Sequence, residues 1–300
     1  MPDRHCGLIL NMNVAGKQTQ VTHPVVGRCI YCGTTKDLTK EHTVPYSLNG
    51  TLMLKEASCK ACAKITSDFE RSFTRETLQV ARHVMGYRTR RPERRRESYK
   101  AEVIIAGQAR LVNMPVDAYA ALLPVIDLGF PKYLTEKYSL TGPEYRIGRR
   151  NNIGVTVSRD WGKTKAFLES IGAERLRSKT TFHAYDFARM VAKIAYCETI
   201  AQLMRNGYEG LESIQENFIL DFILRGGEPP WHYIGGEAPV LPADTSSAAV
   251  HERAVTFKGG DIIAYVQLFV SLGGPRYCVV VGRSTQEFRD RLHREGADDA

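Results

Sequence analysis

Two Cys-x-x-Cys pairs near the N-terminus constrain this chain more than any other feature. Cys29 and Cys32 form the first pair, and Cys59 and Cys62 form the second. Four thiolates at tetrahedral positions make a closed structural zinc site, and Gly33 directly after the first pair allows the tight turn that such a site needs. A redox motif or a disulfide pair is the alternative, but two such pairs together favour a metal. We therefore predict a structural Zn²⁺ bound by the four cysteines.

The segment between the two pairs is predicted to form a hairpin, followed by a helix. Thr39 to Val44 mixes β-branched and polar residues as a strand does, Asn49-Gly50 is typical of a type I′ turn, and Thr51 to Leu54 can return as the partner strand. Apolar residues after Cys62 recur at helical spacing until Gly86, which can end the helix; they are Ile65, Phe69, Phe73, Val80 and Val84. The expected order is strand, hairpin, strand, helix, with Glu41 and His42 on the first strand.

This arrangement resembles the zinc-clipped branch of the HNH endonucleases, whose core is the ββα-metal motif. The resemblance covers Cys29 to Glu70 and consists of C-x2-C, then E-H-x-x-P with S-L-N-G behind it, then a second C-x2-C that opens a helix. It implies a metal-dependent endonuclease that hydrolyses phosphodiester bonds in DNA. By the same resemblance His42 is the general base, Glu41 helps to hold a catalytic divalent ion, and Asn49 orients the histidine.

One position departs from the family pattern. The family has an Asn or His metal ligand directly after the last cysteine, whereas this chain has Ala63, which cannot coordinate a metal. One of Thr66, Ser67 and Glu70 could complete the metal shell, because they lie further along roughly the same helix face. Otherwise the domain binds without cleaving. The segment SCKACAKITSDFE also resembles a bacterial subgroup of HNH proteins in which the Cys-Ala and Ile-Thr elements recur. This resemblance favours a variant active site.

The chemistry of phosphodiester hydrolysis gives each expected group a task. A neutral imidazole at His42 can take a proton from water at cellular pH. A Mg²⁺ or Mn²⁺ ion held partly by Glu41 would neutralise charge on the phosphate and on the departing oxygen. A zinc ion with four thiolates has no open position for this work. Two different metals are therefore expected.

A run of arginines, RTRRPERRR, follows the predicted helix at residues 88–96. Charge runs are ordinarily solvated linkers, but the planar guanidinium of arginine suits phosphate groups. We predict that these side chains contact a nucleic-acid backbone; they are Arg88, Arg90, Arg91, Arg94, Arg95 and Arg96. Because the run contains Pro92 and lacks apolar periodicity, it also marks the predicted boundary between a zinc and nuclease domain at 1–95 and a second domain at 97–300.

Composition sets the bounds on class and partners. A chain of 300 residues has room for two domains, and a net charge of +8 favours an anionic partner, with DNA expected first and RNA as the alternative. The remaining cysteines, Cys6, Cys197 and Cys278, are scattered and odd in number, unlike a secreted disulfide framework. The apolar run Leu8 to Leu10 is too short for a signal peptide, and no segment has transmembrane length. We expect a cytoplasmic protein without a membrane partner, able to form a homo-oligomer.

The second half is expected to be an α+β domain with helices and an antiparallel meander. A hairpin (Tyr99–Ile105 and Ala109–Met114) should precede a loop-rich stretch, Pro115–Gly142, with a short helix near Tyr119. Helices are expected at Trp161–Ile171, at Phe187–Asn206 with Asp186 as its cap, and at Leu211–Leu224. An irregular segment, 228–247, and a charged tail, 289–300, flank the expected meander strands Glu252–Phe257, Ile262–Val270 and Tyr277–Val281.

No nucleotide-binding loop, dinucleotide fingerprint or serine nucleophile motif stands out in the sequence. His183, His232, His251 and His293 have no cysteine or carboxylate partner close in sequence, and each is interpreted as a surface or hydrogen-bonded core residue. Two rival functions stay open. One is a non-catalytic zinc module that binds nucleic acid or a protein partner, and the other is a regulatory protein whose second domain holds a small ligand.

Overall fold

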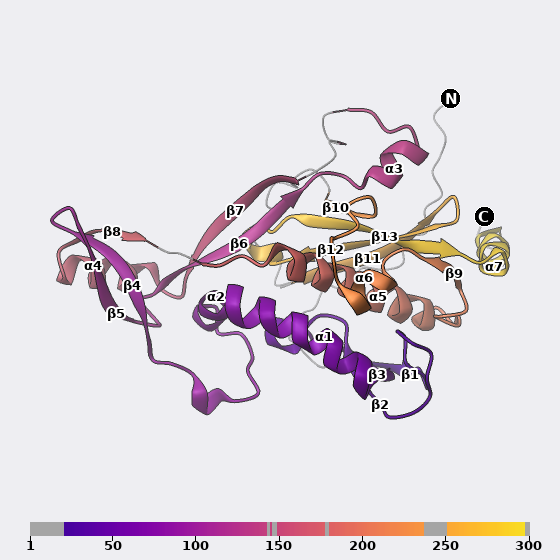
Figure 1. The fold of residues 1–300 in the computed structure, drawn as a ribbon, viewed down its shortest axis with the longest axis horizontal. Coiled ribbons are helices and arrows are strands. Elements are labelled where there is room, and N and C mark those ends of the chain that lie inside the picture. The colour runs from indigo at the N-terminus through magenta and orange to yellow at the C-terminus, as the bar shows by residue number, and fades with distance from the viewer. Residues whose placement is uncertain (1–20, 143–144, 146–148, 178–179, 237–250, 298–300) are drawn as a thin grey trace.

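The protein, seen in a computed structural model, has a mixed α+β fold (Figure 1). The structure describes residues 21–142, 145, 149–177, 180–236 and 251–297. The predicted α+β class is confirmed, and four cysteines gather near the N-terminus as expected. Within these ranges no helix combines the length and the apolar character that crossing a bilayer requires.

The N-terminal part consists of a small sheet and the helix that follows it. Strands β1 (Val21–Val25), β3 (Leu52–Cys59) and β2 (Leu38–His42) lie in that order, with β3 antiparallel to β2 and parallel to β1. Helix α1 (Lys60–Ser72) begins directly after β3. The expected order of strand, strand and helix is therefore present, and it brings both cysteine pairs to the same end of the sheet.

The connection between β2 and β3 is not the predicted type I′ turn. A short 3-10 helix, Tyr46–Leu48, spans it, and Asn49 alone has a left-handed conformation, with φ of 65°. A type I′ turn needs positive φ at both central residues. Gly50 is required for a different reason, since a Cβ there would lie 1.9 Å from the carbonyl oxygen of Val44.

The apolar stripe after Cys62 is real, but it runs along two helices. A π-helical turn, Phe73–Thr77, separates α1 from α2 (Gln79–Val84), and Gly86 ends α2 with a positive φ. Phe69, Phe73 and Val84 are buried, as the periodicity predicted.

The long helix α5 (Ala184–Arg205) and a five-stranded sheet form the centre of the molecule. Strands β11 (His251–Lys258), β12 (Asp261–Leu268) and β13 (Arg276–Ser284) form the predicted antiparallel meander, which is confirmed. Strands β10 (Ile234–Gly236) and β9 (Ile214–Asn217) both pair with β13. Helix α5 packs between this sheet and α1 (Figure 1), so it joins the C-terminal sheet to the N-terminal motif.

The capping prediction for α5 was wrong. The helix begins at Ala184, and Asp186 lies inside its first turn. A carboxylate oxygen of Asp186 instead accepts a hydrogen bond of 2.5 Å from the hydroxyl of Ser72, at the end of α1. This contact ties the two helices together.

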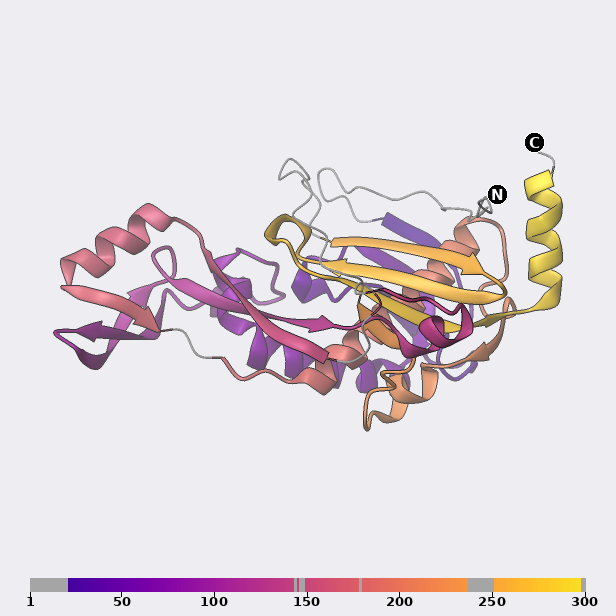
Figure 2. The same ribbon diagram turned by 90° about the horizontal axis from the view of Figure 1, so that it is seen from above.

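A separate lobe projects from one end of the molecule (Figures 1 and 2). It contains the predicted hairpin, now β4 (Ser98–Ile105) and β5 (Gln108–Pro115), with β8 (Ala173–Arg177) beside β4. Helix α4 (Trp161–Ser170) matches its prediction and is capped by Asp160, whose side chain accepts from the Lys163 N–H. A two-stranded ribbon of β6 (Ala120–Leu128) and β7 (Arg149–Ser158) leads to this lobe.

Three predictions in the second half were wrong. The stretch expected to be loop-rich contains β6 and α3 (Lys132–Lys137); Pro124 is tolerated in β6 because this strand has a partner on one edge only. The helix expected at Leu211–Leu224 is β9 followed by α6 (Leu220–Arg225), since the Asn217 side chain accepts from the N–H groups that start α6. The short helix expected near Tyr119 is a turn at 116–118 that leads into β6. The charged tail, for which no element was predicted, belongs up to residue 297 to helix α7 (Gln286–Ala297). The predicted irregular segment contains β10, and its residues 237–247 lie outside the described ranges.

Residues from both sides of the predicted boundary at residue 96 share one buried cluster. Phe73 of the N-terminal part packs against Phe187 of α5, with ring centroids 5.1 Å apart, and Phe187 packs in turn against Tyr277 of β13. The N-terminal motif therefore rests on α5 instead of forming an isolated core.

Candidate metal centre and arginine cleft

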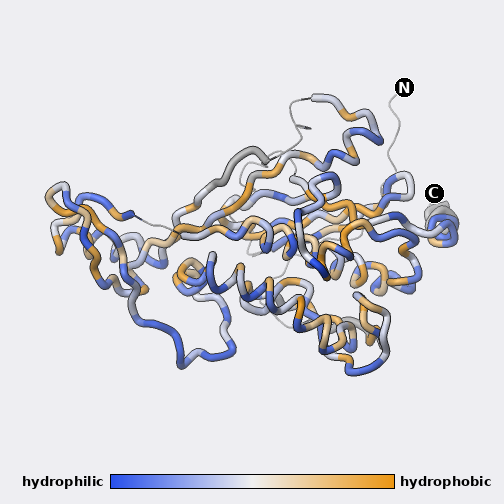
Figure 3. The backbone as a smooth tube through the Cα atoms, viewed as in Figure 1, coloured by the Kyte–Doolittle hydropathy of each residue, from blue (hydrophilic) through white to orange (hydrophobic). Residues whose placement is uncertain are grey.

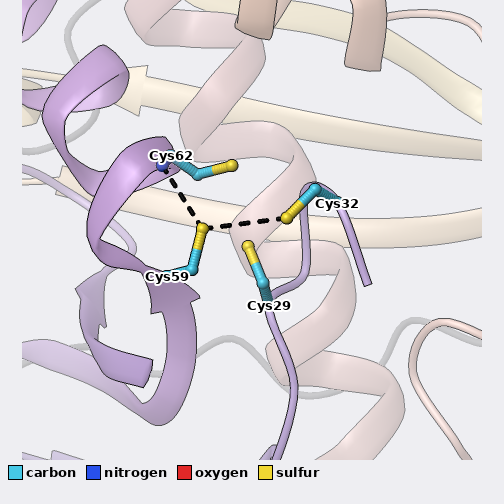
Figure 4. A group of neighbouring side chains, drawn as sticks. All are labelled: Cys29, Cys32, Cys59 and Cys62. Carbon is cyan, nitrogen blue, oxygen red and sulfur yellow. Dashed lines mark hydrogen bonds between the residues drawn. The ribbon is translucent and has the colours of Figure 1, made fainter. Parts of the chain in front are cut away.

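The four cysteines come from two places that the fold brings together (Figure 4). Cys29 and Cys32 lie in the turn before β2, whereas Cys59 ends β3 and Cys62 lies in the first turn of α1. All four sulfur atoms lie within 4.8 Å of one another. The Sγ atoms of Cys32 and Cys59 are 3.7 Å apart, close to the ~3.8 Å that a tetrahedral site with Zn–S bonds of about 2.3 Å requires. These residues could hold a structural metal such as zinc.

Hydrogen bonds around the cysteines favour the thiolate form of Cys59. The backbone N–H of Cys62 donates to the Cys59 sulfur at 3.5 Å, and Gly33, with φ of 75°, donates to the carbonyl of Cys29 at 2.9 Å. Burial acts to raise the pKa of Cys59, but hydrogen bonds from Cys62 and the neighbouring thiols outweigh it and lower the pKa to about 7. Burial raises the pKa of Cys29 and that of Cys62, so Cys59 is the one of these three thiols that ionises most easily.

A buried lysine lies between the two carboxylates that sequence reasoning connected with a catalytic metal. The Nζ atom of Lys193, on α5, is 2.7 Å from Oε1 of Glu41 and 2.9 Å from Oε1 of Glu70. It also donates a hydrogen bond to the carbonyl oxygen of His42. The Lys193 side chain is fully buried, and Glu41 is 6% exposed.

The charges in this cluster depend on one another. Burial alone would lower the pKa of Lys193, but Glu41 and Glu70 outweigh it, and the net direction is upward, so the ammonium stays charged. Burial raises the pKa of Glu70, and Lys193 offsets part of that effect. Removing Lys193 would leave two buried carboxylates without their cation, which proteins rarely tolerate.

His42 lies at the end of β2, beside this cluster. Its ring is 5.9 Å from that of Tyr46, in an edge-on arrangement. Burial, with contributions from Lys193, Lys40 and Arg90, lowers the pKa of His42 to about 4. The imidazole is therefore neutral at pH 7, the form in which a general base acts, and the low pKa makes it a weak base.

A cleft of about 710 Å³ lies along α1, α2 and the arginine run. All six predicted arginines line it, together with three that the prediction did not include; the full set is Arg71, Arg75, Arg82, Arg88, Arg90, Arg91, Arg94, Arg95 and Arg96. The segment between α2 and β4 is hydrophilic over most of its length (Figure 3). Tyr46 and Glu70 also line the cleft, so the cleft reaches the lysine and carboxylate cluster. We call it the arginine cleft.

Hydrogen bonds to backbone carbonyls hold two arginines of the cleft in place. Arg82 donates from its guanidinium to the carbonyls of Ser47 and Thr74, at 2.6 Å and 2.9 Å. Arg95 donates to the carbonyl of Tyr87 at 2.8 Å. Arg82 is therefore a structural member of the cleft, and burial lowers its pKa to about 10.

Six arginines of the cleft have charge to offer a ligand. They are exposed, and none of them makes an ion pair with a residue in the described part of the chain: Arg75, Arg90, Arg91, Arg94, Arg95 and Arg96. The guanidinium of Arg90 lies over the Tyr46 ring, 5.9 Å from its centroid, and that of Arg96 lies over Tyr99 at 5.7 Å. Uncompensated guanidinium groups beside aromatic rings are suited to an anion that carries flat bases.

The residues proposed to complete a divalent-metal shell do not converge on one point. Thr66 is buried, and its hydroxyl donates to the carbonyl of Ala63 at 3.3 Å. Ser67 lines the arginine cleft, and Glu70 contacts Lys193. Asn49, which the resemblance assigned to His42, instead accepts a hydrogen bond from the backbone N–H of Arg88 at 2.8 Å. Glu41 and Glu70 thus meet an ammonium group, and the residues present do not fit a divalent ion between them.

Sequence reasoning missed Lys193. Its partners are far away in the chain, with 151 positions between Lys193 and His42. One signal was available, because Lys193 is the single lysine of a helix whose pattern predicts burial, and a buried lysine needs an anionic partner.

No family model, no curated protein and no solved structure matches this chain. Residue geometry and the HNH resemblance are therefore the grounds for a functional proposal.

Proposed function

We propose that this protein holds a nucleic-acid backbone, DNA in the first instance, in the arginine cleft and hydrolyses a phosphodiester bond beside His42. The observation that supports this most is the convergence of the six predicted arginines on one cleft that reaches Tyr46 and Glu70. Phosphate groups are recognised by guanidinium groups of this kind.

The reaction uses groups of this chain alone. The neutral His42 ring takes a proton from a water molecule, whose oxygen attacks the phosphorus. The bond from phosphorus to the 3′ oxygen breaks, and that oxygen takes a proton from solvent. Arginines at the near end of the cleft, Arg90 first, neutralise charge on the phosphate. We propose zinc as the metal of the four cysteines, where it would link the turn before β2 to the start of α1.

A second candidate is a module that binds nucleic acid without cleaving it. The contact of Lys193 with Glu41 and Glu70 favours it, as does Ala63, because both leave the family's divalent-metal site without its usual ligands. The two candidates share the arginine cleft and differ only in what His42 does.

Two measurements on the full chain separate these candidates. Fluorescence anisotropy with labelled duplex and single-stranded DNA and RNA tests binding, and no binding at low salt would reject both. Nicking of supercoiled plasmid, measured with Mg²⁺, with Mn²⁺ and with EDTA, tests hydrolysis. Cleavage that the His42→Ala variant loses supports the nuclease. DNA binding without cleavage under any of these conditions supports the binding module.

A further inference from the structure

We propose that Lys193 takes the place of the catalytic divalent cation in this protein, so that Glu41 and Glu70 bind an ammonium group and no Mg²⁺ or Mn²⁺. This inference rests on the proposed function, since it concerns the same site, and it defines which cation that site uses.

The first step is the position of the ammonium group. Nζ lies within 2.9 Å of one carboxylate oxygen of Glu41 and one of Glu70. A Mg²⁺ ion bound to the same two oxygens would lie about 2.1 Å from each. A divalent ion on the same two oxygens would lie close to Nζ, and like charges at so short a distance repel each other strongly. Occupation by Lys193 and occupation by a divalent ion are therefore mutually exclusive.

The second step concerns the partners that hold the ammonium group of Lys193 in place. Its ammonium group forms ion pairs with Glu41 and Glu70 and donates hydrogen bonds to the carbonyl of His42 and, at 3.5 Å, to the carbonyl of Thr43. One turn along α5 lies Cys197, whose sulfur is 3.3 Å from the Tyr31 hydroxyl in a fully buried position. The sulfur of Cys197 is a weak acceptor for an ammonium group. Displacing Lys193 would therefore bury an unpaired charge.

The third step is the lack of other ligands. Hard divalent cations require several oxygen ligands, but Ala63 supplies none and Thr66 donates its hydroxyl to a backbone carbonyl. With Lys193 present, the carboxylates are already neutralised in part. Glu41 and Glu70 thus form a cation site whose cation is the ammonium group of Lys193.

Mn²⁺ binding to the zinc-loaded full chain tests this proposal directly, by electron paramagnetic resonance of free Mn²⁺ and by calorimetry. We expect no saturable Mn²⁺ binding that depends on Glu41 or Glu70. Saturable binding to the wild-type protein that is lost in Glu41→Gln or Glu70→Gln would overturn the proposal. This measurement needs no lysine variant, so it gives an answer even where such a variant fails to fold.

A lysine variant extends the test. In Lys193→Met the two carboxylates lose their cation, and we expect Mn²⁺ to bind there and to raise the melting temperature, as ligands of the folded state do. The wild-type melting temperature should not change with Mn²⁺. The control is Lys193→Met combined with Glu41→Gln and Glu70→Gln, which removes the charges together and should be insensitive to Mn²⁺. A folded Lys193→Met protein whose melting temperature does not change with Mn²⁺ would contradict the assignment of Glu41 and Glu70 as a cation site.

The nuclease proposal and the lysine proposal fail in different ways. Absence of DNA binding would reject the proposed function and would leave the Mn²⁺ result unaffected. Cleavage that requires Mg²⁺, together with Mn²⁺ binding through Glu41, would support a nuclease and reject the role of Lys193.

Discussion

The side-chain oxygen of Asn49 accepts a hydrogen bond of 2.8 Å from the backbone N–H of Arg88. Asn49 lies in the loop between β2 and β3, and Arg88 opens the arginine run, 39 positions later. This bond holds the start of the arginine run against the loop that carries Tyr46. An asparagine suits the position because it tolerates the left-handed conformation, which Asn49 has with φ of 65°.

Replacing Asn49 should weaken nucleic-acid binding and lower stability. Asn49→Gly keeps the left-handed conformation and removes the hydrogen bond, so we expect a loss of about 1 kcal/mol in unfolding free energy. Asn49→Ala should lose about 1 kcal/mol more, because alanine resists positive φ. Both variants should bind DNA several-fold more weakly by anisotropy, since the arginine run is less ordered. Equal affinity in Asn49→Gly and wild type would show that this bond does not organise the cleft.

The arginines of the cleft should give DNA binding a steep salt dependence. For duplex DNA each phosphate contact adds about 0.9 to the slope of log K against log salt concentration. Arg91→Gln and Arg94→Gln should each reduce that slope by about 1 and weaken binding to all sequences alike. Arg225→Gln is the matched control, because Arg225 is 81% exposed on α6, pairs with Asp221 and does not line the cleft. A slope that is equal in all four proteins would mean that DNA binds elsewhere.

Features encoded over short stretches of sequence could be predicted. The spacing of the cysteines and the alternation in β11 to β13 depend on neighbours in the chain, and both appear in the structure as expected. The arginine run lines one cleft, and its contact with a nucleic-acid backbone stays a prediction. Strand β6 was missed because Pro124 counts against a strand, yet β6 has an open edge where the missing N–H does no harm.

Features that depend on distant contacts could not be predicted in this way. Lys193 meets Glu41 and Glu70 only because α5 packs against α1 and the N-terminal sheet. The family resemblance predicted that Asn49 orients His42. Its actual partner, the backbone N–H of Arg88, is set by how the segment after α2 folds back. In both cases a polar group in the sequence indicates that a partner must exist, and only the fold says which one it is.

His251 should make the protein less stable as the pH falls. Its Nε2 is 2.6 Å from the carbonyl oxygen of Leu48, and its Nδ1 accepts from the Phe269 N–H at 3.2 Å. Only the neutral ring with its proton on Nε2 satisfies both contacts. Burial lowers the pKa of His251 to about 4, although the hydrogen bond to Leu48 acts in the opposite direction. The unfolded chain, with a pKa near 6.5, therefore binds a proton at a higher pH than the folded protein does.

The stability that the neutral His251 contributes is complete above the unfolded pKa and is lost as the pH falls from about 6.5 toward 4. Between pH 7 and pH 5 the loss should be about 2 kcal/mol, measured by urea unfolding at both values. His251→Gln cannot titrate, so its unfolding free energy should fall by correspondingly less over the same interval. An identical pH dependence in variant and wild type would show that the pKa of His251 is the same in the folded and the unfolded protein.

The metal of the four cysteines should be required for the N-terminal part to fold. We expect zinc to co-purify with the wild-type chain and to be absent from Cys59→Ser combined with Cys62→Ser, by elemental analysis. Because β3 and α1 meet at these residues, and binding free energy is folding free energy in such sites, the double variant should lose ordered structure around β2, β3 and α1, as measured by hydrogen exchange.

Cys278→Ala is the control, since Cys278 is buried in β13, away from the cluster. This variant should retain zinc. Full zinc content in the double variant would place the metal elsewhere. Loss of zinc with unchanged protection of α1 would mean that packing against α5 alone supports the motif.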